Sequence, residues 1–108
     1  MQVQVTHALG AGEARRRLER FVDALVARDW PGGVEVRDVA TRWVGNHLDF
    51  AFVLARAFFS APVAGTLDVD GAAATLETAI PPMVVAFVGE ERIREVLARE
   101  LAQALETP

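Results

Sequence analysis

The stretch from Gln2 to Asp29 constrains the fold of this chain more than any other. Residues 2–7 alternate polar and apolar side chains, which is the period of a half-buried strand. Gly10 is a candidate helix N-cap, and the carboxylate of Glu13 stands where it can reach back to the free N–H of that cap. After Gly10, apolar residues recur at helical spacing: Ala14, Leu18, Phe21, Val22 and Leu25. The sequence therefore predicts a strand, a sharp turn and one long helix whose apolar face packs on a sheet.

Four further strands are predicted after this helix, each separated from the next by turn residues. The first spans about Val34 to Val44, and a bulge or break is expected at Asp38, where the alternation fails. Gly45-Asn46 and Asp70-Gly71 are typical of hairpin turns, and Ser60-Ala61-Pro62 is expected to form the turn between the second and third of these strands. The strands are therefore expected to pair as a meander of antiparallel neighbours.

The C-terminal part of the chain is predicted to be a second helix. Pro81-Pro82 ends the sheet, the helix can start at Pro82, and Gly89 is expected to kink it. Its apolar stripe is formed by Ile93, Val96, Leu97, Leu101, Ala104 and Leu105. The predicted fold is a single α+β domain over residues 1–108, in the order β-α-β-β-β-β-α. It has a five-stranded, mostly antiparallel sheet with both helices on one face, and the first strand lies either at an edge or beside the last strand.

The beginning of the chain also resembles a known family. The residues His7-Ala8-Leu9-Gly10 and Glu13-Ala14-Arg15-Arg16-Arg17 are similar to the His-x-Leu-Gly-x-x-Glu-Ala-(Arg/Lys)-Arg opening of the polyhydroxyalkanoic acid system family. The resemblance continues through Trp43-x-Gly45-x-x-Leu48-x-Phe50 and Gly65-x-Leu67-x-Val69 to a proline-led C-terminal helix after Ile80, so it covers most of the chain. The family consists of small bacterial proteins associated with polyester-granule gene regions. Residues 51–61 are more apolar, and carry fewer charges, than is typical of it.

Composition excludes several classes of protein and of site. Hydrophobic residues make up 52% and charged residues 24% of the chain, which is typical of a globular domain. The chain has no cysteine, so it can form neither disulfides nor thiolate metal sites. A net charge of −4 argues against broad nucleic-acid binding. No apolar run is long enough for a transmembrane helix and no secretory signal opens the sequence, so we expect a bacterial cytoplasmic protein.

The two histidines are the main candidates for chemistry, and neither pattern predicts catalysis. His7 is expected to hydrogen-bond a backbone group or a cap carboxylate; the alternative is a polar group at the mouth of a pocket. His47 and Asp49 are expected to be solvated residues near a turn; the alternative is a dyad or a weak metal pair, since they share one face of a strand, but no further Cys or His completes a site. Ser60, the single serine, lacks a nucleophile-elbow pattern. We therefore expect no enzyme activity, no catalytic residues, no cofactor and no metal.

A basic cluster lies on the first helix, formed by Arg15, Arg16, Arg17 and Arg20. Arginine stems cover apolar surface while their charged ends stay in water, so a solvated helix face is the expected role. A patch that contacts an anion is the alternative. The acidic balance of the whole chain counts against a large patch of this kind.

The surplus of apolar residues carries the most functional information. Large apolar patches on proteins mark a partner, a ligand cleft or contact with an apolar surface. The strand that starts at His47 is expected to turn Leu48 and Phe50 inward, and to leave a second apolar row outward. The candidate interaction surface is formed by Ala51, Val53, Ala55, Phe59, Met83 and Phe87. We expect a homodimer, with sheets packed face to face or helices exchanged.

Two functions follow from these observations. The resemblance implies a non-enzymatic accessory protein of polyhydroxyalkanoate storage, which associates with granules or granule proteins through its apolar surface. The alternative is a small apolar-ligand-binding module, with a cavity of a few hundred Å³ or more between the first helix and the sheet. The candidate pocket is lined by His7, Phe21, Leu25, Trp43, Phe50 and Phe52.

Overall fold

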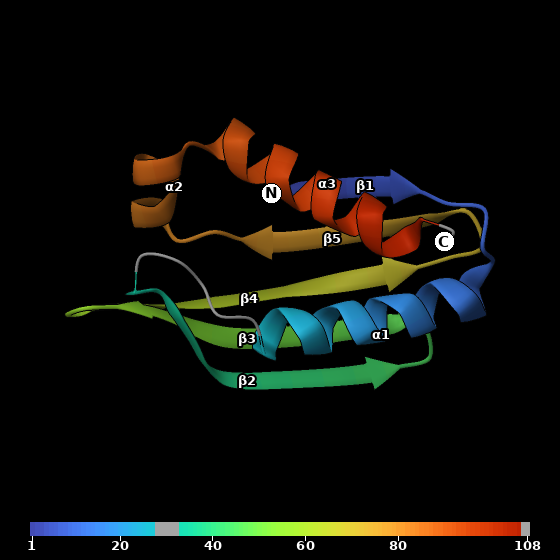
Figure 1. The fold of residues 1–108 in the computed structure, drawn as a ribbon, viewed down its shortest axis with the longest axis horizontal. Coiled ribbons are helices and arrows are strands. Elements are labelled where there is room, and N and C mark those ends of the chain that lie inside the picture. The colour runs from blue at the N-terminus through green and yellow to red at the C-terminus, as the bar shows by residue number, and fades with distance from the viewer. Residues whose placement is uncertain (28–32, 107–108) are drawn as a thin grey trace.

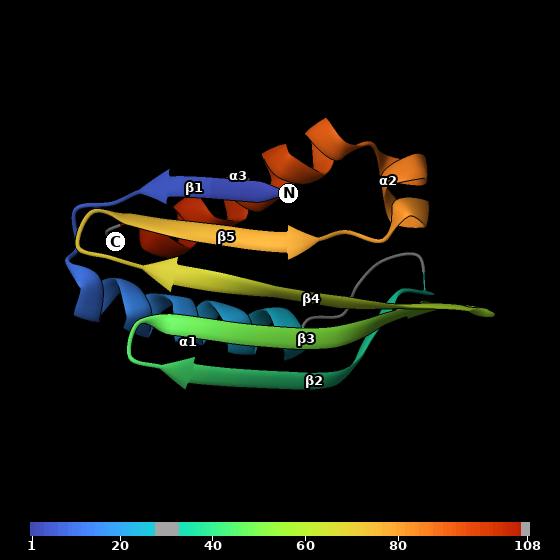
Figure 2. The same cartoon turned by 180° about the vertical axis from the view of Figure 1, so that it is seen from behind.

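The computed structural model describes residues 1–27 and 33–106, apart from the side chains of Met83, Phe87 and Val88. In chain order its elements are β1 (Gln2–Thr6), α1 (Ala11–Ala27), β2 (Glu35–Val44), β3 (His47–Arg56), β4 (Phe59–Val69), β5 (Ala73–Ala79), α2 (Pro82–Val88) and α3 (Glu90–Leu105). The two long helices, α1 and α3, lie on the same face of one sheet, and the opposite face is left open (Figures 1 and 2). The expected α+β architecture is confirmed.

The sheet has five strands in the order β1-β5-β4-β3-β2, and every neighbouring pair is antiparallel. The first strand lies both at an edge and beside the last strand, because β1 pairs only with β5. The four strands after α1 follow one another as a meander, as expected. Short hairpin connections keep the entropy cost of closing the loops between these strands small.

Two local features of β2 agree with the sequence prediction. The register of β2 against β3 shifts between Arg37 and Ala40, and Asp38 has a φ of 54°, so the expected bulge is present. Gly45 follows β2 with a φ of 60°, as the first central residue of a type II′ hairpin turn requires. A bulge in an edge strand increases its twist, which hinders pairing with a strand of another chain.

The predicted turn at Ser60-Ala61-Pro62 is wrong, because these residues belong to β4. The chain instead turns at Ala57 and Phe58, and Ala57 has a φ of 53°. Pro62 pairs with Val53 of β3, whereas the pairing of β4 with β5 begins only at Ala64. Pro62 therefore lies at a local edge of the sheet, where the missing N–H group of a proline is tolerated.

Helix α1 begins directly after Gly10, whose φ is 80° and whose carbonyl accepts a hydrogen bond from the Ala14 N–H at 3.1 Å. The expected capping role of Glu13 is wrong. Its carboxylate instead accepts hydrogen bonds from Arg16 at 2.8 Å and Arg17 at 3.1 Å, which lower the pKa of Glu13. Guanidinium groups three and four residues along a helix are close enough to compete for the carboxylate, and charged donors bind it more strongly than a backbone N–H.

The C-terminal helical region is divided at Gly89, where only a kink was expected. Pro81 precedes α2 and Pro82 opens it, as the sequence predicts. Gly89 has φ 91° and ψ 138°, a conformation in which a helix cannot continue. Helix α3 therefore starts afresh at Glu90 and lies against β1.

The packed core lies at one end of the molecule, where α1 begins and α3 ends. Its buried residues are Val3, Ala14, Leu18, Leu48, Leu67, Val69, Ala74, Leu76, Leu101 and Leu105. Gly65 lies opposite Phe50 in register, and a Cβ atom there would stand 2.6 Å from the Phe50 ring. Toward the β3–β4 turn, Phe52 and Leu54 are only half-buried. On β3, apolar burial on the helix-covered face therefore decreases toward the turn, whereas Val63 and Ala61 of β4 stay buried beside it.

Candidate functional site

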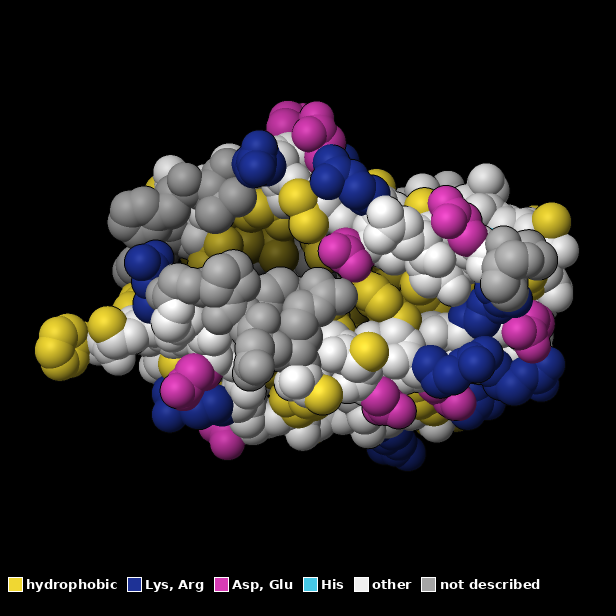
Figure 3. Space-filling model, in the orientation of Figure 1, with side chains coloured by type: hydrophobic (Ala, Val, Ile, Leu, Met, Phe, Trp, Pro, Cys, Tyr) yellow, Lys and Arg dark blue, Asp and Glu magenta, His cyan; other side chains and the backbone are white. Residues whose placement is uncertain are grey.

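The β3–β4 hairpin projects beyond the rest of the sheet (Figures 1 and 2). It does so because β4 continues past its pairing with β5 for several residues, to the turn at Ala57 and Phe58. The Phe58 side chain is 108% exposed, and hydrophobic side chains are visible at the projecting end in Figure 3. Leaving a phenylalanine in water forgoes about 1.5–3 kcal/mol of burial free energy. A fully exposed aromatic residue at a projecting tip is therefore a candidate contact with a partner or surface.

In the half next to this hairpin, the open face of the sheet is largely apolar on β3, β4 and β5, whereas β2 places the ion pair of Glu35 and Arg37 there. Val53 of β3 pairs with Pro62 of β4 and forms one cross-strand row. The next row is made of four exposed alanines in register on β2, β3, β4 and β5: Ala40, Ala51, Ala64 and Ala79. Side chains this short leave a flat surface. The hairpin and the adjoining half of the open face together form an apolar end of the sheet.

The other half of the open face is charged. Arg42 lies opposite Asp49, and the His47 ring bonds both Asp68 and, through Nε2 at 3.2 Å, Asp49. The hydrogen bond to Asp68, followed by the one to Asp49, raises the pKa of His47 above its usual value. Glu77 adds a further carboxylate to the row that contains Asp49. On β3, β4 and β5 the open face is therefore divided into an apolar end and a charged end, and β2 adds the Glu35–Arg37 pair beside the apolar end.

Three residues of the predicted interaction surface lie on β3, and they differ in exposure. Ala51 is exposed and Val53 is half-buried on the open face, as expected. Ala55 is buried, with 7% of its surface accessible, so including it was wrong. Its methyl group lies between Glu35 and Ser60, its partners on both neighbouring strands, whose longer side chains flank it.

The other predicted surface residues are distributed differently. Phe59 was expected to continue the outward row of β3, but it is the first residue of β4 and alternates with Ala61 and Val63 on the helix-covered face, where it is half-buried. This correction follows from the turn at Ala57 and Phe58. Met83 and Phe87 belong to α2, and their side chains lie outside the described residues.

Most of the predicted pocket residues pack against one another or against the core in the described part of the chain. Trp43 and Phe50 pack against the core, and the guanidinium of Arg15 lies over the Trp43 ring at 5.1 Å from its centroid. Phe52 stacks on Phe50 with ring centroids 6.2 Å apart and an interplanar angle of 18°. Leu25 is half-buried near the end of α1. These contacts indicate that the aromatic residues fill space between α1 and the sheet.

His7 has a structural role, as the simpler of its two interpretations predicts. Its Nδ1 accepts the Leu9 N–H at 3.2 Å, which leaves the proton on Nε2, and Nε2 donates to the Asp70 carbonyl at 3.0 Å. The Asp70 carboxylate accepts the N–H groups of Ala72 and Ala73, which lower its pKa. His7 therefore joins the turn before α1 to the turn between β4 and β5.

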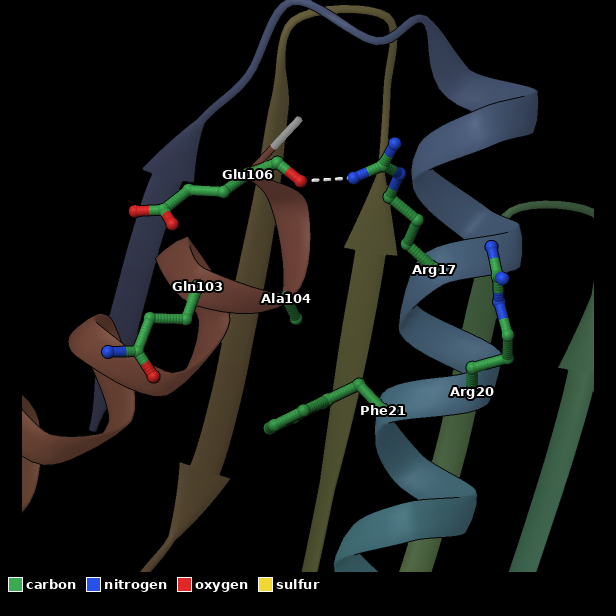
Figure 4. A pocket seen from close by; sticks show the side chains of 6 residues that line it. All are labelled: Arg17, Arg20, Phe21, Gln103, Ala104 and Glu106. Atoms are coloured by element: carbon green, nitrogen blue, oxygen red, sulfur yellow. Dashed lines mark hydrogen bonds between the residues drawn. The ribbon is translucent and has the colours of Figure 1, made fainter. Parts of the chain in front are cut away.

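A cleft lies between α1 and α3 (Figure 4). This cleft has a volume of about 440 Å³ and is lined by Arg17, Arg20, Phe21, Gln103, Ala104 and Glu106. Phe21 is the single residue that it shares with the predicted pocket. One guanidinium nitrogen of Arg17 donates to the Glu106 carbonyl at the end of α3, which joins the two helices. The cleft is an open groove between helices and not a cavity under α1.

The described part of the chain has no cluster of three His, Asp or Glu side chains that could hold a metal ion. Within the same residues, no helix is long and apolar enough to cross a membrane. The sequence analysis missed Phe58, because alternation along a strand that continues to Phe59 turns Phe59 outward, whereas β3 ends at Arg56 and Phe58 lies in the turn. No family model, curated protein or solved structure matches this chain.

Proposed function

We propose that this protein is a non-enzymatic accessory protein of bacterial polyhydroxyalkanoate storage, which attaches to the granule surface through its projecting β3–β4 hairpin. The full exposure of Phe58 at the tip of that hairpin carries the proposal. The flat apolar rows that adjoin it extend the contact beyond one side chain. The resemblance of residues 7–17 to the polyhydroxyalkanoic acid system family supports a polyester granule as the surface and the cytoplasm as the compartment.

The dimensions of the apolar rows favour a surface over a second copy of the chain. The alanine row spans four strands and the Val53–Pro62 row spans two, so together they cover roughly 200 Å², from a strand spacing of about 4.8 Å and a rise of about 3.3 Å per residue. A stable protein interface buries about 800 Å² on each partner. A homodimer would therefore need to include the charged end of the sheet as well. If the chain does form a homodimer, its sedimentation coefficient should increase with protein concentration.

Replacing Phe58 tests the proposal. Phe58→Asp places a charge at the tip, and we expect co-sedimentation with isolated polyhydroxybutyrate granules to weaken about tenfold or more, since burial of one phenylalanine is worth about 1.5–3 kcal/mol. Val44→Asp is the matched control, because Val44 is also exposed (57%) but ends β2 at the opposite end of the sheet. Granule binding by Phe58→Asp equal to that of the parent would refute the proposal.

The alternative function, a module for small apolar ligands, requires a cavity between α1 and the sheet. The cleft of 440 Å³ lies between α1 and α3 instead, and two of its lining residues are arginines. A wholly apolar ligand would partly desolvate both guanidinium groups and offer neither a new hydrogen-bond partner. Granule attachment therefore remains the better-supported function, and the cleft requires a ligand of different chemistry.

A further inference from the structure

We propose that the cleft between α1 and α3 binds a carboxylate that carries a short apolar tail. Its volume of about 440 Å³ lies within the range of small-molecule sites, about 300–1,000 Å³. The cleft is separate from the β3–β4 hairpin, so this inference does not depend on granule attachment.

The cationic end of the cleft is formed by Arg17 and Arg20, whose guanidinium groups lie toward the same end in Figure 4. Arg17 is held by Glu13, at 3.1 Å from its Nε, and by the Glu106 carbonyl, so its remaining N–H groups have a fixed direction. Arg20 is exposed and makes no ion pair within residues 1–27 and 33–106. Arginine is well suited to carboxylates because its planar fork can donate two parallel hydrogen bonds.

The only acidic residue among those that line the cleft does not oppose this charge. In Figure 4 the Glu106 carboxylate points away from Arg17 and Arg20, and only its backbone oxygen faces Arg17. The charged side chains that face the cleft are therefore cationic, although the whole chain has a net charge of −4. The cleft is therefore locally positive on a negatively charged chain, which favours binding of an anion over a cation. Two arginines are too few to bind a polyanion such as a nucleic acid, so a small anion fits better.

The other end of the cleft is apolar. The Phe21 ring points from α1 into the space between the helices, toward Ala104 of α3 (Figure 4). The small side chain of Ala104 leaves room beside the ring. Leu97 lies two turns earlier on the same face of α3 and is half-buried against the core. A cationic end and an apolar end in one groove match the two parts of an amphiphilic carboxylate.

Sodium decanoate, kept below its micelle concentration, is the probe that tests this site. At a pH near 8 decanoate is fully ionised, and we expect saturable amide shifts in heteronuclear NMR spectra at residues 17–21 and 103–106. Decyltrimethylammonium has the same tail and the opposite charge, so it should give no saturable shift there. Equal binding of both amphiphiles, or no saturable decanoate shift below the micelle concentration, would overturn the inference.

Variants assign the binding to named residues. Arg20→Gln should weaken decanoate binding about threefold, the range for an exposed charge pair, while Phe21→Ala should weaken it through loss of tail contacts. Arg99→Gln removes an exposed arginine from another face of α3 and should leave binding unchanged. Phe58→Asp should also leave it unchanged, which separates this site from granule attachment. An Arg20→Gln variant that binds decanoate as the parent does would contradict the assigned role of Arg20.

Discussion

Gly65 is the residue at which an added methyl group meets the closest contacts. A Cβ atom there would lie 2.4 Å from the Glu77 carbonyl oxygen and 2.6 Å from the Phe50 ring. Neither group can move away easily, since the first is backbone and the second packs against the core. We expect Gly65→Ala to lower the free energy of unfolding by about 1–3 kcal/mol in urea denaturation, the usual cost of overpacking.

Gly71→Ala is the control for this prediction, because nothing lies within 4 Å of a Cβ atom placed there. We expect its free energy of unfolding to stay within about 0.5 kcal/mol of the parent. If both variants lose the same stability, the close packing of Phe50 over Gly65 is not the cause.

Sequence reasoning at the residue scale succeeds where the chemistry is local. His7 could be predicted to be structural because it lies between a strand and a helix start, where free backbone groups are close. Glu13 could not be assigned from the capping pattern alone, since Arg16 and Arg17 compete for the same carboxylate. Phe58 was missed because its exposure depends on where β3 ends.

At the scale of elements, the cross-strand contact between His47 of β3 and Asp68 of β4 predicts a pH dependence of stability. The pKa of His47 is raised, so the protonated ring is stabilised in the folded state. This contribution is fully present below the unfolded pKa of about 6.5 and is lost as the pH rises through the higher folded pKa.

Comparison of the parent with His47→Gln measures this contribution by urea unfolding at two pH values. The stability advantage of the parent should be larger near pH 5.5 than near pH 9. An advantage that is constant, or that grows as the pH rises, would contradict the contact between His47 and the two aspartates.

The boundaries of the strands show which turns can be predicted from neighbouring residues and which cannot. The bulge at Asp38 and the turn at Gly45 follow from residues next to each other in sequence, and both were predicted. The turn at Ala57 and Phe58 was misplaced, because Ser60-Ala61-Pro62 has the composition of a turn. Whether a proline interrupts β4 depends on which strand flanks it, and β5 does not reach Pro62. The pairing of β4 with β5 cannot be deduced from the residues next to Pro62 in the sequence.

At the scale of the whole molecule, the chain has a packed end and an apolar end. The buried core gathers where α1 begins, whereas half-buried side chains, the alanine row and Phe58 lie toward the projecting hairpin. Alternation along β3 was sufficient to predict Ala51 and Val53 as surface residues. The cleft between α1 and α3 could not be predicted, because it depends on how two helices distant in sequence approach each other.

The most direct test of the central claim, that the hairpin end contacts the granule, uses the absence of cysteine from the chain. Ala57→Cys, which keeps Phe58, and Val44→Cys each give one labelling site for an environment-sensitive fluorophore, one at either end of the sheet. When polyhydroxybutyrate granules are added, the account predicts a blue shift of the emission from position 57 and no shift from position 44. Equal shifts at both positions, or a shift at position 44 alone, would contradict it.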